Sequence, residues 1–141
     1  TVAYCPRASA YFGHPQPGRS PHRYRQMLEA GVNVALGTDS LICLDTPNRI
    51  SVLDEMRFLY RRDGTDPMTL LRMATTAGAV ALGADPSLVT LAPGPTAGVL
   101  AATFDPRNPL DPFRQVLQRN DPERWIVAPV PAGESQTGPT T

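Results

Sequence analysis

The stretch GVNVALGTDS, residues 31–40, is the clearest indication of the fold. Its branched apolar residues alternate with the small Ala35, a pattern typical of a strand that is covered on both faces in a parallel sheet. Asp39 follows where this strand ends. Two interpretations of its carboxylate stay open: Asp39 begins the next turn, or it points into an active site at the carboxyl edge of the sheet.

A strand and a helix precede this stretch. The alternation in TVAYC, residues 1–5, predicts a short strand. Ser20-Pro21 has the form of an N-cap and a first-turn proline, and Gly31 is the expected stop of a helix over about 21–30. Strand, helix and strand in this order predict a βαβ unit with parallel strands. Residues 6–20 are dense in Pro, Gly and Ser and predict a long loop, which is a common place for a binding wall.

Two more helices are expected downstream. Thr46-Pro47 and Asp66-Pro67 each have the form of an N-cap followed by a first-turn proline, and Gly64 and Gly83 are the expected stops. Residues 1–83 are therefore expected to form one α/β part.

The pattern changes after this part. Residues 84–105 contain short β-prone pieces around the turn at Pro93-Gly94 and predict the strands of a small β element. Residues 106–141 predict a C-terminal extension that is partly disordered. Within it, four apolar residues could dock a short helix and a strand: Phe113, Val116, Leu117 and Trp125.

Composition excludes several classes of partner. The 141 residues include 13 basic and 13 acidic side chains, so no broad charged surface for nucleic acid or an anionic membrane is expected. Cys5 and Cys43 stand alone and predict free thiols in a reducing compartment. The sequence shows no signal-peptide pattern and no apolar run of the ~20 residues that a membrane span needs, so we expect a cytoplasmic protein. The chain enters a predicted strand directly at Thr1, which points to a cut edge.

Five segments, taken in order, carry a resemblance to a known family. Together they resemble the C-terminal portion of the amidohydrolase superfamily, in the branch that holds chlorohydrolases, guanine deaminase and related aminohydrolases. The resemblance covers roughly residues 2–105. Its segments are CPRAS (5–9), MLEAGVNVALGTDS (27–40), LDEMR (53–57), MATTAGAVALG (73–83) and LAPGPTAGVL (91–100).

The resemblance implies an α/β fold. The chain would form the C-terminal part of a metal-dependent (β/α)8 TIM barrel, with its last two strands and helices, and it would add strands of a small β-sandwich. TVAYC then resembles the seventh barrel strand and VNVALG the eighth. One divalent metal, zinc or iron, is implied, with its histidine ligands outside this chain. Asp39 matches the aspartate that contacts the metal and handles protons, so it is both the catalytic and the metal-ligand candidate.

Three residues near the first strand are candidates for binding substrate. Arg7 could orient a polar substrate at the strand end, or it could be an exposed loop arginine. Ser9 stands where the family has a longer polar side chain, which bears on substrate identity. His14 could reach the pocket mouth, or it could be a solvated loop residue. Glu55 and its neighbours in LDEMR are expected on a solvated or packing face.

The implied function is that of a fragment of a hydrolase acting on non-peptide carbon–nitrogen bonds. It would deaminate or dechlorinate a small heterocyclic substrate through a metal-activated water. The alternative is a non-catalytic remnant, or a half-barrel subunit that needs a partner chain. The expected partner is the missing N-terminal barrel portion. Whether the intact enzyme also forms a homo-oligomer is left open. The isolated chain is expected to be inactive, because one carboxylate cannot hold a metal alone.

Overall fold

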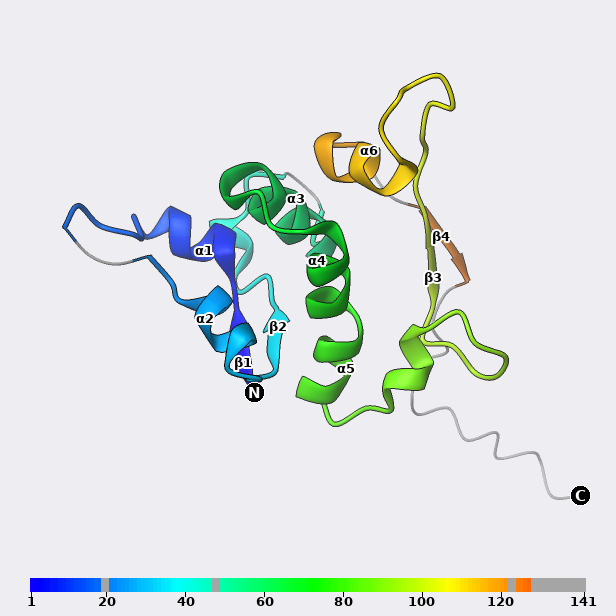
Figure 1. The fold of residues 1–141 in the computed structure, drawn as a ribbon, viewed down its shortest axis with the longest axis horizontal. Coiled ribbons are helices and arrows are strands. Elements are labelled where there is room, and N and C mark those ends of the chain that lie inside the picture. Colours follow the sequence, from blue (N-terminus) through cyan, green and yellow to red (C-terminus); the bar gives the residue numbers. More distant parts are fainter. Residues whose placement is uncertain (19–20, 47–48, 122–123, 128–141) are drawn as a thin grey trace, which may run out of the picture.

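A parallel pair of strands organises the N-terminal part of the chain (Figure 1). β1 (Val2–Tyr4) and β2 (Val34–Leu36) pair in parallel, and α1 (Pro6–Tyr11) and α2 (Tyr24–Glu29) lie on the connection between them. The predicted βαβ unit is therefore confirmed. All three residues of β2 are buried, as predicted for a strand covered on both faces. The computed structural model describes residues 1–18, 21–46, 49–121 and 124–127.

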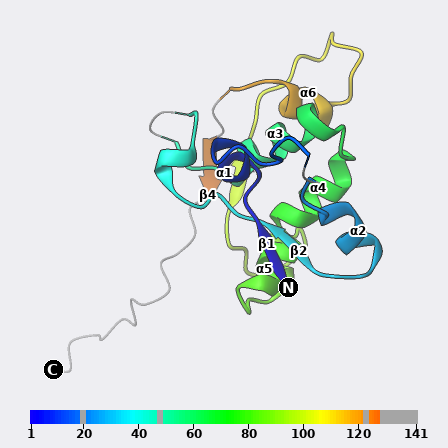
Figure 2. The same ribbon diagram turned by 90° about the vertical axis from the view of Figure 1, so that its left-hand side faces the viewer.

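Three α-helices follow the strand pair and cover it. After the short 3-10 helix η1 (Leu41–Cys43), the chain forms α3 (Val52–Asp63), α4 (Pro67–Ala74) and α5 (Thr76–Ala81). All three α-helices pack against β2. Figure 2 shows α1 beside α3 at the end of the strand pair opposite the N-terminus.

Some helix starts differ from the sequence-based expectation. The predicted loop 6–20 begins with α1, because Pro6 suits a first helical turn and Arg7 and Ala8 are buried. α3 begins at Val52 and not after Thr46, since the side chain of Ser51 accepts a hydrogen bond from the Leu53 amide and caps the helix. α2 begins at Tyr24 and not at the expected Pro21. The expected cap Ser20 and the expected first-turn residue Pro47 lie outside the described residues.

The predicted helix start at Asp66 is confirmed. The Asp66 carboxylate accepts a hydrogen bond from the Thr69 amide at 2.9 Å and caps α4. Gly64, with φ of 61°, ends α3 in the left-handed conformation that glycine tolerates best. The expected single helix up to Gly83 is divided in two, because the backbone of Thr75 leaves the helical region at φ −117° and ψ −89°.

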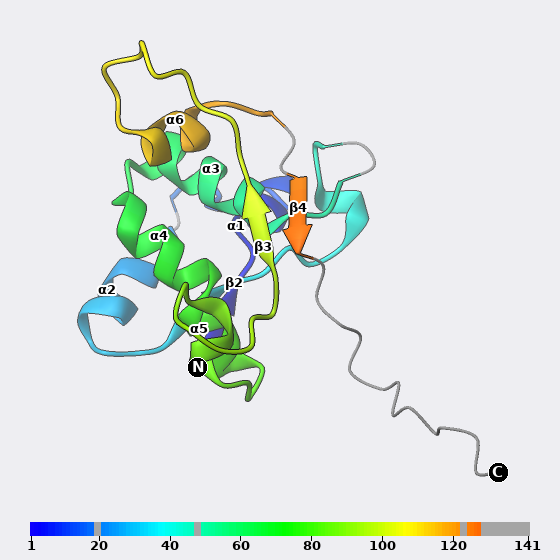
Figure 3. The same ribbon diagram turned by 90° about the vertical axis from the view of Figure 1, so that its right-hand side faces the viewer.

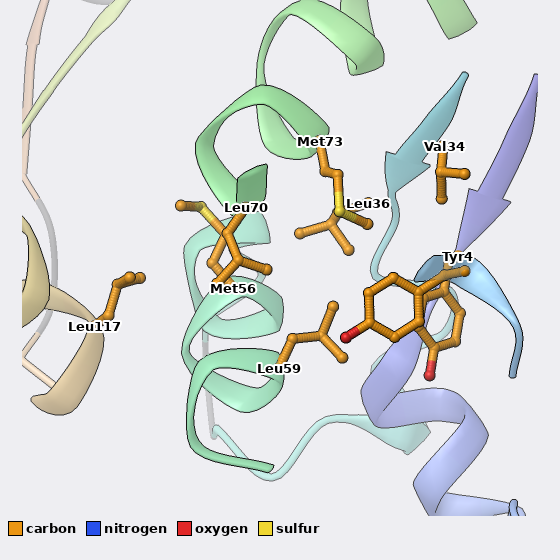
Figure 4. Close-up of a cluster of buried hydrophobic side chains, with 9 residues drawn as sticks. Tyr4, Val34, Leu36, Met56, Leu59, Leu70, Met73 and Leu117 are labelled. Atoms are coloured by element: carbon orange, nitrogen blue, oxygen red, sulfur yellow. The ribbon is translucent and has the colours of Figure 1, made fainter. Parts of the chain in front are cut away.

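The hydrophobic core lies between the strands and the helices (Figure 4). Leu59, Leu70 and Leu117 have no exposed surface. Figure 4 shows Leu117 entering from the far side of α3 and α4 relative to the strands. Burying a side chain of this size contributes about 1.5–3 kcal/mol. The cluster joins β1, α2, β2, α3, α4 and α6 through nine residues: Tyr4, Tyr24, Val34, Leu36, Met56, Leu59, Leu70, Met73 and Leu117.

The C-terminal part adds an antiparallel strand pair and one helix. After η2 (Pro86–Val89), β3 (Val99–Ala101) pairs with β4 (Arg124–Val127), and α6 (Pro112–Gln118) lies between them in the sequence. Figure 3 shows this pair side by side at the surface of the helical part. The short helix and strand predicted beyond residue 105 are thus present.

The small β element consequently joins two ranges, 84–105 and 106–141, that the sequence pattern assigned to separate parts. Of the C-terminal extension 106–141, which was expected to be partly disordered, residues 122–123 and 128–141 lie outside the described residues. Within the described part of the chain, no helix has the length and apolar character that crossing a membrane requires.

Candidate active site

The carboxyl ends of β1 and β2 bring two loops into contact. The Gly37 amide donates to the carbonyl oxygen of Tyr4 at 2.9 Å, which extends the strand pairing by one step. Cys5 follows Tyr4, and a Cβ atom added at Gly37 would lie only 3.0 Å from its Sγ atom. Glycine at position 37 therefore lets the second loop lie directly against the first.

Asp39 stands on this edge in an unusual conformation. Its φ of 60° is left-handed, which costs energy for residues other than glycine, although Asp tolerates it better than most. The side chain is exposed, and its carboxylate accepts no hydrogen bond from the described residues. A carboxylate that served the turn would accept from nearby backbone amides. No described amide supplies such a bond, and the role of Asp39 in an active site stays a prediction.

The Cys5 thiol lies near two carboxylates at this edge. Burial raises the pKa of the Cys5 thiol, and the nearby carboxylates of Asp39 and Glu55 raise it further. Cys5, Gly37 and Asp39 are therefore the residues that the structure brings together at the strand ends.

Arg7 is not an exposed loop arginine, and two of its three guanidinium nitrogens donate to protein acceptors. It is 4% exposed, its Nε donates to Oε1 of Glu55 at 2.6 Å, and its backbone amide donates to Oε2 at 3.0 Å. Its Nη1 donates to Asp45 Oδ1 and to Thr46 Oγ1, both at 3.0 Å. Its Nη2 is buried and has no partner among the described residues. The role of Arg7 in binding substrate stays a prediction.

Glu55 lies beside the strand ends, although the sequence interpretation did not single it out. Its side chain is completely buried in the first turn of α3, which agrees with the packing face and not with the solvated face that were both left open. Burial raises the pKa of the Glu55 carboxyl, although the hydrogen bonds from Arg7 oppose this. One signal was available, because Glu55 precedes the fully buried Leu59 by four residues and so shares its helix face.

Ser9 and His14 do not contact Asp39. The Ser9 hydroxyl donates to the carbonyl oxygen of Cys5 at 3.0 Å, and this bond holds it within α1. His14 is exposed, and its backbone amide donates to the carbonyl oxygen of Ser9. Their predicted contacts with substrate are not tested by this arrangement and stay predictions.

Two cavities open beside Arg7, and neither includes Asp39. One of about 330 Å³ has a polar lining from Arg7, Asp45, Thr46, Arg49, Asp54, Phe58, Arg61 and Asn120. The other, of about 290 Å³, lies between α1 and η1 and is lined by Arg7, Ala10, Tyr11, Ile42, Cys43, Leu44, Asp45 and Phe58. Catalytic groups of parallel α/β folds gather at the carboxyl ends of strands, so the strand ends and not these cavities are the candidate site.

Comparison with known proteins decides the family. The amidohydrolase family profile matches residues 2–133, which is most of the chain. The chain belongs to the amidohydrolase family. An amidohydrolase domain implies a TIM-barrel fold, and the mixture of helices and strands in this chain agrees with that class.

Similar proteins share one name. The chain is 43% identical over 77 residues to a 5-methylthioadenosine/S-adenosylhomocysteine deaminase of Syntrophomonas wolfei, covering 49% of this chain and 17% of the relative. It is 33% identical over 111 residues to the deaminase of the same name from Pelotomaculum thermopropionicum, covering 73% of this chain and 24% of the relative. The chain thus spans less than a quarter of the length of these relatives. No solved structure matches it significantly.

A buried polar network fastens the C-terminal segment of this amidohydrolase chain to α3. Arg57, which is 1% exposed, donates to Asp54 Oδ1 at 2.8 Å and to the carbonyl oxygens of Val116 at 3.0 Å and Asp121 at 2.8 Å. Arg49 donates to both oxygens of Asp54, at 2.7 and 2.8 Å. Burial raises the pKa of Asp54, but the hydrogen bonds from Arg49 and Arg57 outweigh it and hold that pKa below its usual 3.8.

This network predicts acid sensitivity. We expect the free energy of unfolding to fall as the pH drops below about 4, because a carboxyl with a lowered folded pKa stabilises the fold above its unfolded pKa and loses that effect as the pH falls through the folded value. Asp63, whose pKa is held down mainly by Arg62 against the effect of burial, acts in the same direction. Glu55 acts in the opposite direction, because its pKa is raised.

Urea unfolding of the wild type and of Asp54→Asn over a pH series from about 3 to 6 checks this expectation. The fall in the free energy of unfolding on acidification should be smaller in Asp54→Asn, because one of the titrating groups is gone. Equal losses in the two proteins would show that Asp54 is not a source of the acid sensitivity.

Proposed function

We propose that this chain is the C-terminal part of a hydrolase that removes the amino group of a heterocycle. The observation that carries the proposal is Asp39, an exposed carboxylate held in a left-handed conformation at the carboxyl edge of a parallel strand pair. Strained residues at such edges are typical of active sites. The names of the relatives favour adenosine-type substrates, and so favour deamination over dechlorination.

Deamination needs a group that moves a proton. Water adds to the ring carbon that bears the amino group, a C–O bond forms, the C–N bond breaks, and ammonia leaves. A carboxylate beside the reacting atoms can accept a proton from the water and deliver it to the leaving nitrogen. Asp39 is suited to this role, since its side chain is exposed directly after β2, whereas Glu55 is buried and held by Arg7.

A metal site cannot be built from this part of the chain alone. Amidohydrolases generally use a divalent metal, but the described residues contain no group of three or more His, Cys, Asp or Glu side chains that could hold one. Asp39 is the single ligand that we propose the chain contributes. Zinc or iron, with histidine ligands from outside this chain, stays a prediction.

The placement of the strands is part of the proposal. We assign β1 and β2 to the seventh and eighth strands of the barrel, which their parallel pairing supports, and β3 and β4 to the small β-sandwich. The remaining barrel strands would then pair with the outer edges of β1 and β2. The required partner is the N-terminal barrel portion, on the same polypeptide or, in the half-barrel alternative, on another one.

Ammonia release by the full-length protein tests the function. We expect turnover of 5-methylthioadenosine and S-adenosylhomocysteine, slower turnover of guanine, and no chloride release from a chlorinated triazine. Folded, metal-loaded protein that releases neither ammonia nor chloride from any of the four would contradict the proposal. Chloride release alone would replace deamination by dechlorination.

A further inference from the structure

We propose that Arg7 and Glu55 form a positioning pair that fixes the strand end carrying Asp39, and that Arg7 does this in place of contacting substrate. The inference rests on the proposed function of Asp39. It starts from the finding that Arg7 and Glu55 are 4% and 0% exposed and lie 48 positions apart in the sequence. An arginine that served only to bind substrate would have its guanidinium open toward the ligand.

The pair holds the loop after β1 to α3. Glu55 accepts from two groups of Arg7, the Nε at 2.6 Å and the backbone amide at 3.0 Å. The second bond fixes the first turn of α1, which begins directly after Cys5. Figure 2 shows the resulting closeness of α1 and α3. Because Cys5 lies against Gly37, the position of α1 also limits where the loop after β2 can go.

The same guanidinium also holds the end of the second loop, the segment 37–46 that follows β2. Arg7 Nη1 donates at 3.0 Å to Asp45 and to Thr46, both of which follow Asp39 and η1 in the chain. Asp39 therefore lies on a segment fixed at two places, by the strand pairing at Gly37 and by Arg7 at Asp45 and Thr46. This arrangement keeps Asp39 in its left-handed conformation, although no described residue donates a hydrogen bond to its carboxylate.

The chemistry of the two side chains suits this role. The planar guanidinium donates from Nε and Nη1 in fixed directions and so connects three segments at once, which the point charge of lysine cannot do. A buried ion pair often adds little to stability compared with an apolar pair. We therefore assign the pair to the geometry of the strand end.

Steady-state kinetics of the full-length enzyme separate positioning from binding. Arg7→Lys is expected to lower kcat about 10- to 100-fold with KM changed less than about twofold, because displacement of a catalytic group by about 1 Å costs this much. The exposed pair Arg114–Asp111, with both side chains 52% exposed, supplies the matched control Arg114→Lys, which should keep wild-type kinetics. A rise in KM with unchanged kcat would overturn the proposal in favour of substrate binding.

A milder variant covers the case in which Arg7→Lys does not fold. The double substitution Asp45→Ala/Thr46→Val removes the bonds to Nη1 together with the bond from the Thr46 hydroxyl to the Arg49 carbonyl oxygen, and it leaves the buried pair intact. It is expected to lower kcat about tenfold without a matching rise in KM. Wild-type kcat in this double variant would overturn the proposed link to the second loop.

A readout independent of activity distinguishes failure of this inference from failure of the proposed function. Cys5 is partly exposed and Cys43 is buried, so a thiol reagent followed by peptide mass spectrometry reports on the strand end. Labelling of Cys5 should be at least about fivefold faster in either variant than in the wild type or Arg114→Lys, because loosened loops expose the thiol more often. Unchanged labelling would overturn the inference even if the enzyme deaminates, and faster labelling would support it even if it does not.

Discussion

Asp39→Asn in the full-length enzyme is expected to lose about 10²- to 10⁴-fold in kcat while its fold stays intact, because proton transfer by a positioned side chain contributes that much. Asparagine has nearly the same shape and also tolerates the left-handed conformation that Asp39 adopts at φ 60°. The measurement is kcat for 5-methylthioadenosine, together with the urea midpoint of each protein.

Two further variants sharpen this test. Asp39→Ala should lose as much activity and should also be less stable by about 1–2 kcal/mol, because alanine disfavours the left-handed region. Glu29→Ala, which removes an exposed carboxylate at the end of α2, is the matched control and should keep wild-type turnover. Near-normal kcat in Asp39→Asn would remove Asp39 from the mechanism.

Arg57→Leu is expected to lower the free energy of unfolding by about 3–5 kcal/mol, the range found when one partner of a buried ion pair is removed. The substitution deprives Asp54 of one of its two arginines, and it leaves the carbonyl oxygens of Val116 and Asp121 without the Arg57 donor. Urea unfolding, followed by circular dichroism, measures the change.

The same helix offers a control for the loss of one arginine. Arg61 is exposed and donates to the side-chain oxygen of Asn120 at 2.8 Å. Arg61→Ala should cost less than about 1 kcal/mol, as exposed polar pairs generally do. Equal destabilisation by the two substitutions would contradict the special role assigned to the buried network around Asp54.

Much of the fold could be predicted from local patterns. Alternation around Ala35 predicted a buried parallel strand, and the Asp66-Pro67 pair predicted a capped helix, because both features depend on residues next to one another in the sequence. The predicted start of α3 was wrong because it too was judged only from neighbouring residues. Thr46 resembled a cap, yet its hydroxyl accepts a hydrogen bond from Arg7, 39 positions away.

The site was predictable only where it depends on strand position. Asp39 was singled out because it follows a strand, whereas its left-handed backbone and the exposure of its side chain appear only in three dimensions. The pairing of Arg7 with Glu55 spans 48 positions, so no periodicity within a single helix reveals it. Burial of charged residues is decided by such distant partners, and composition alone favours a solvated surface for them.

The contact between α3 and α6 has a consequence for synthesis on the ribosome. Arg57 and the Val116 carbonyl that it binds are 59 positions apart, and Leu117 completes the cluster that contains Leu59. At about 5–20 residues per second, translation delivers α6 roughly 3–12 s after α3. During that interval the nascent chain presents the uncovered face of α3 and α4, a surface that a chaperone would recognise and that closes only when α6 arrives.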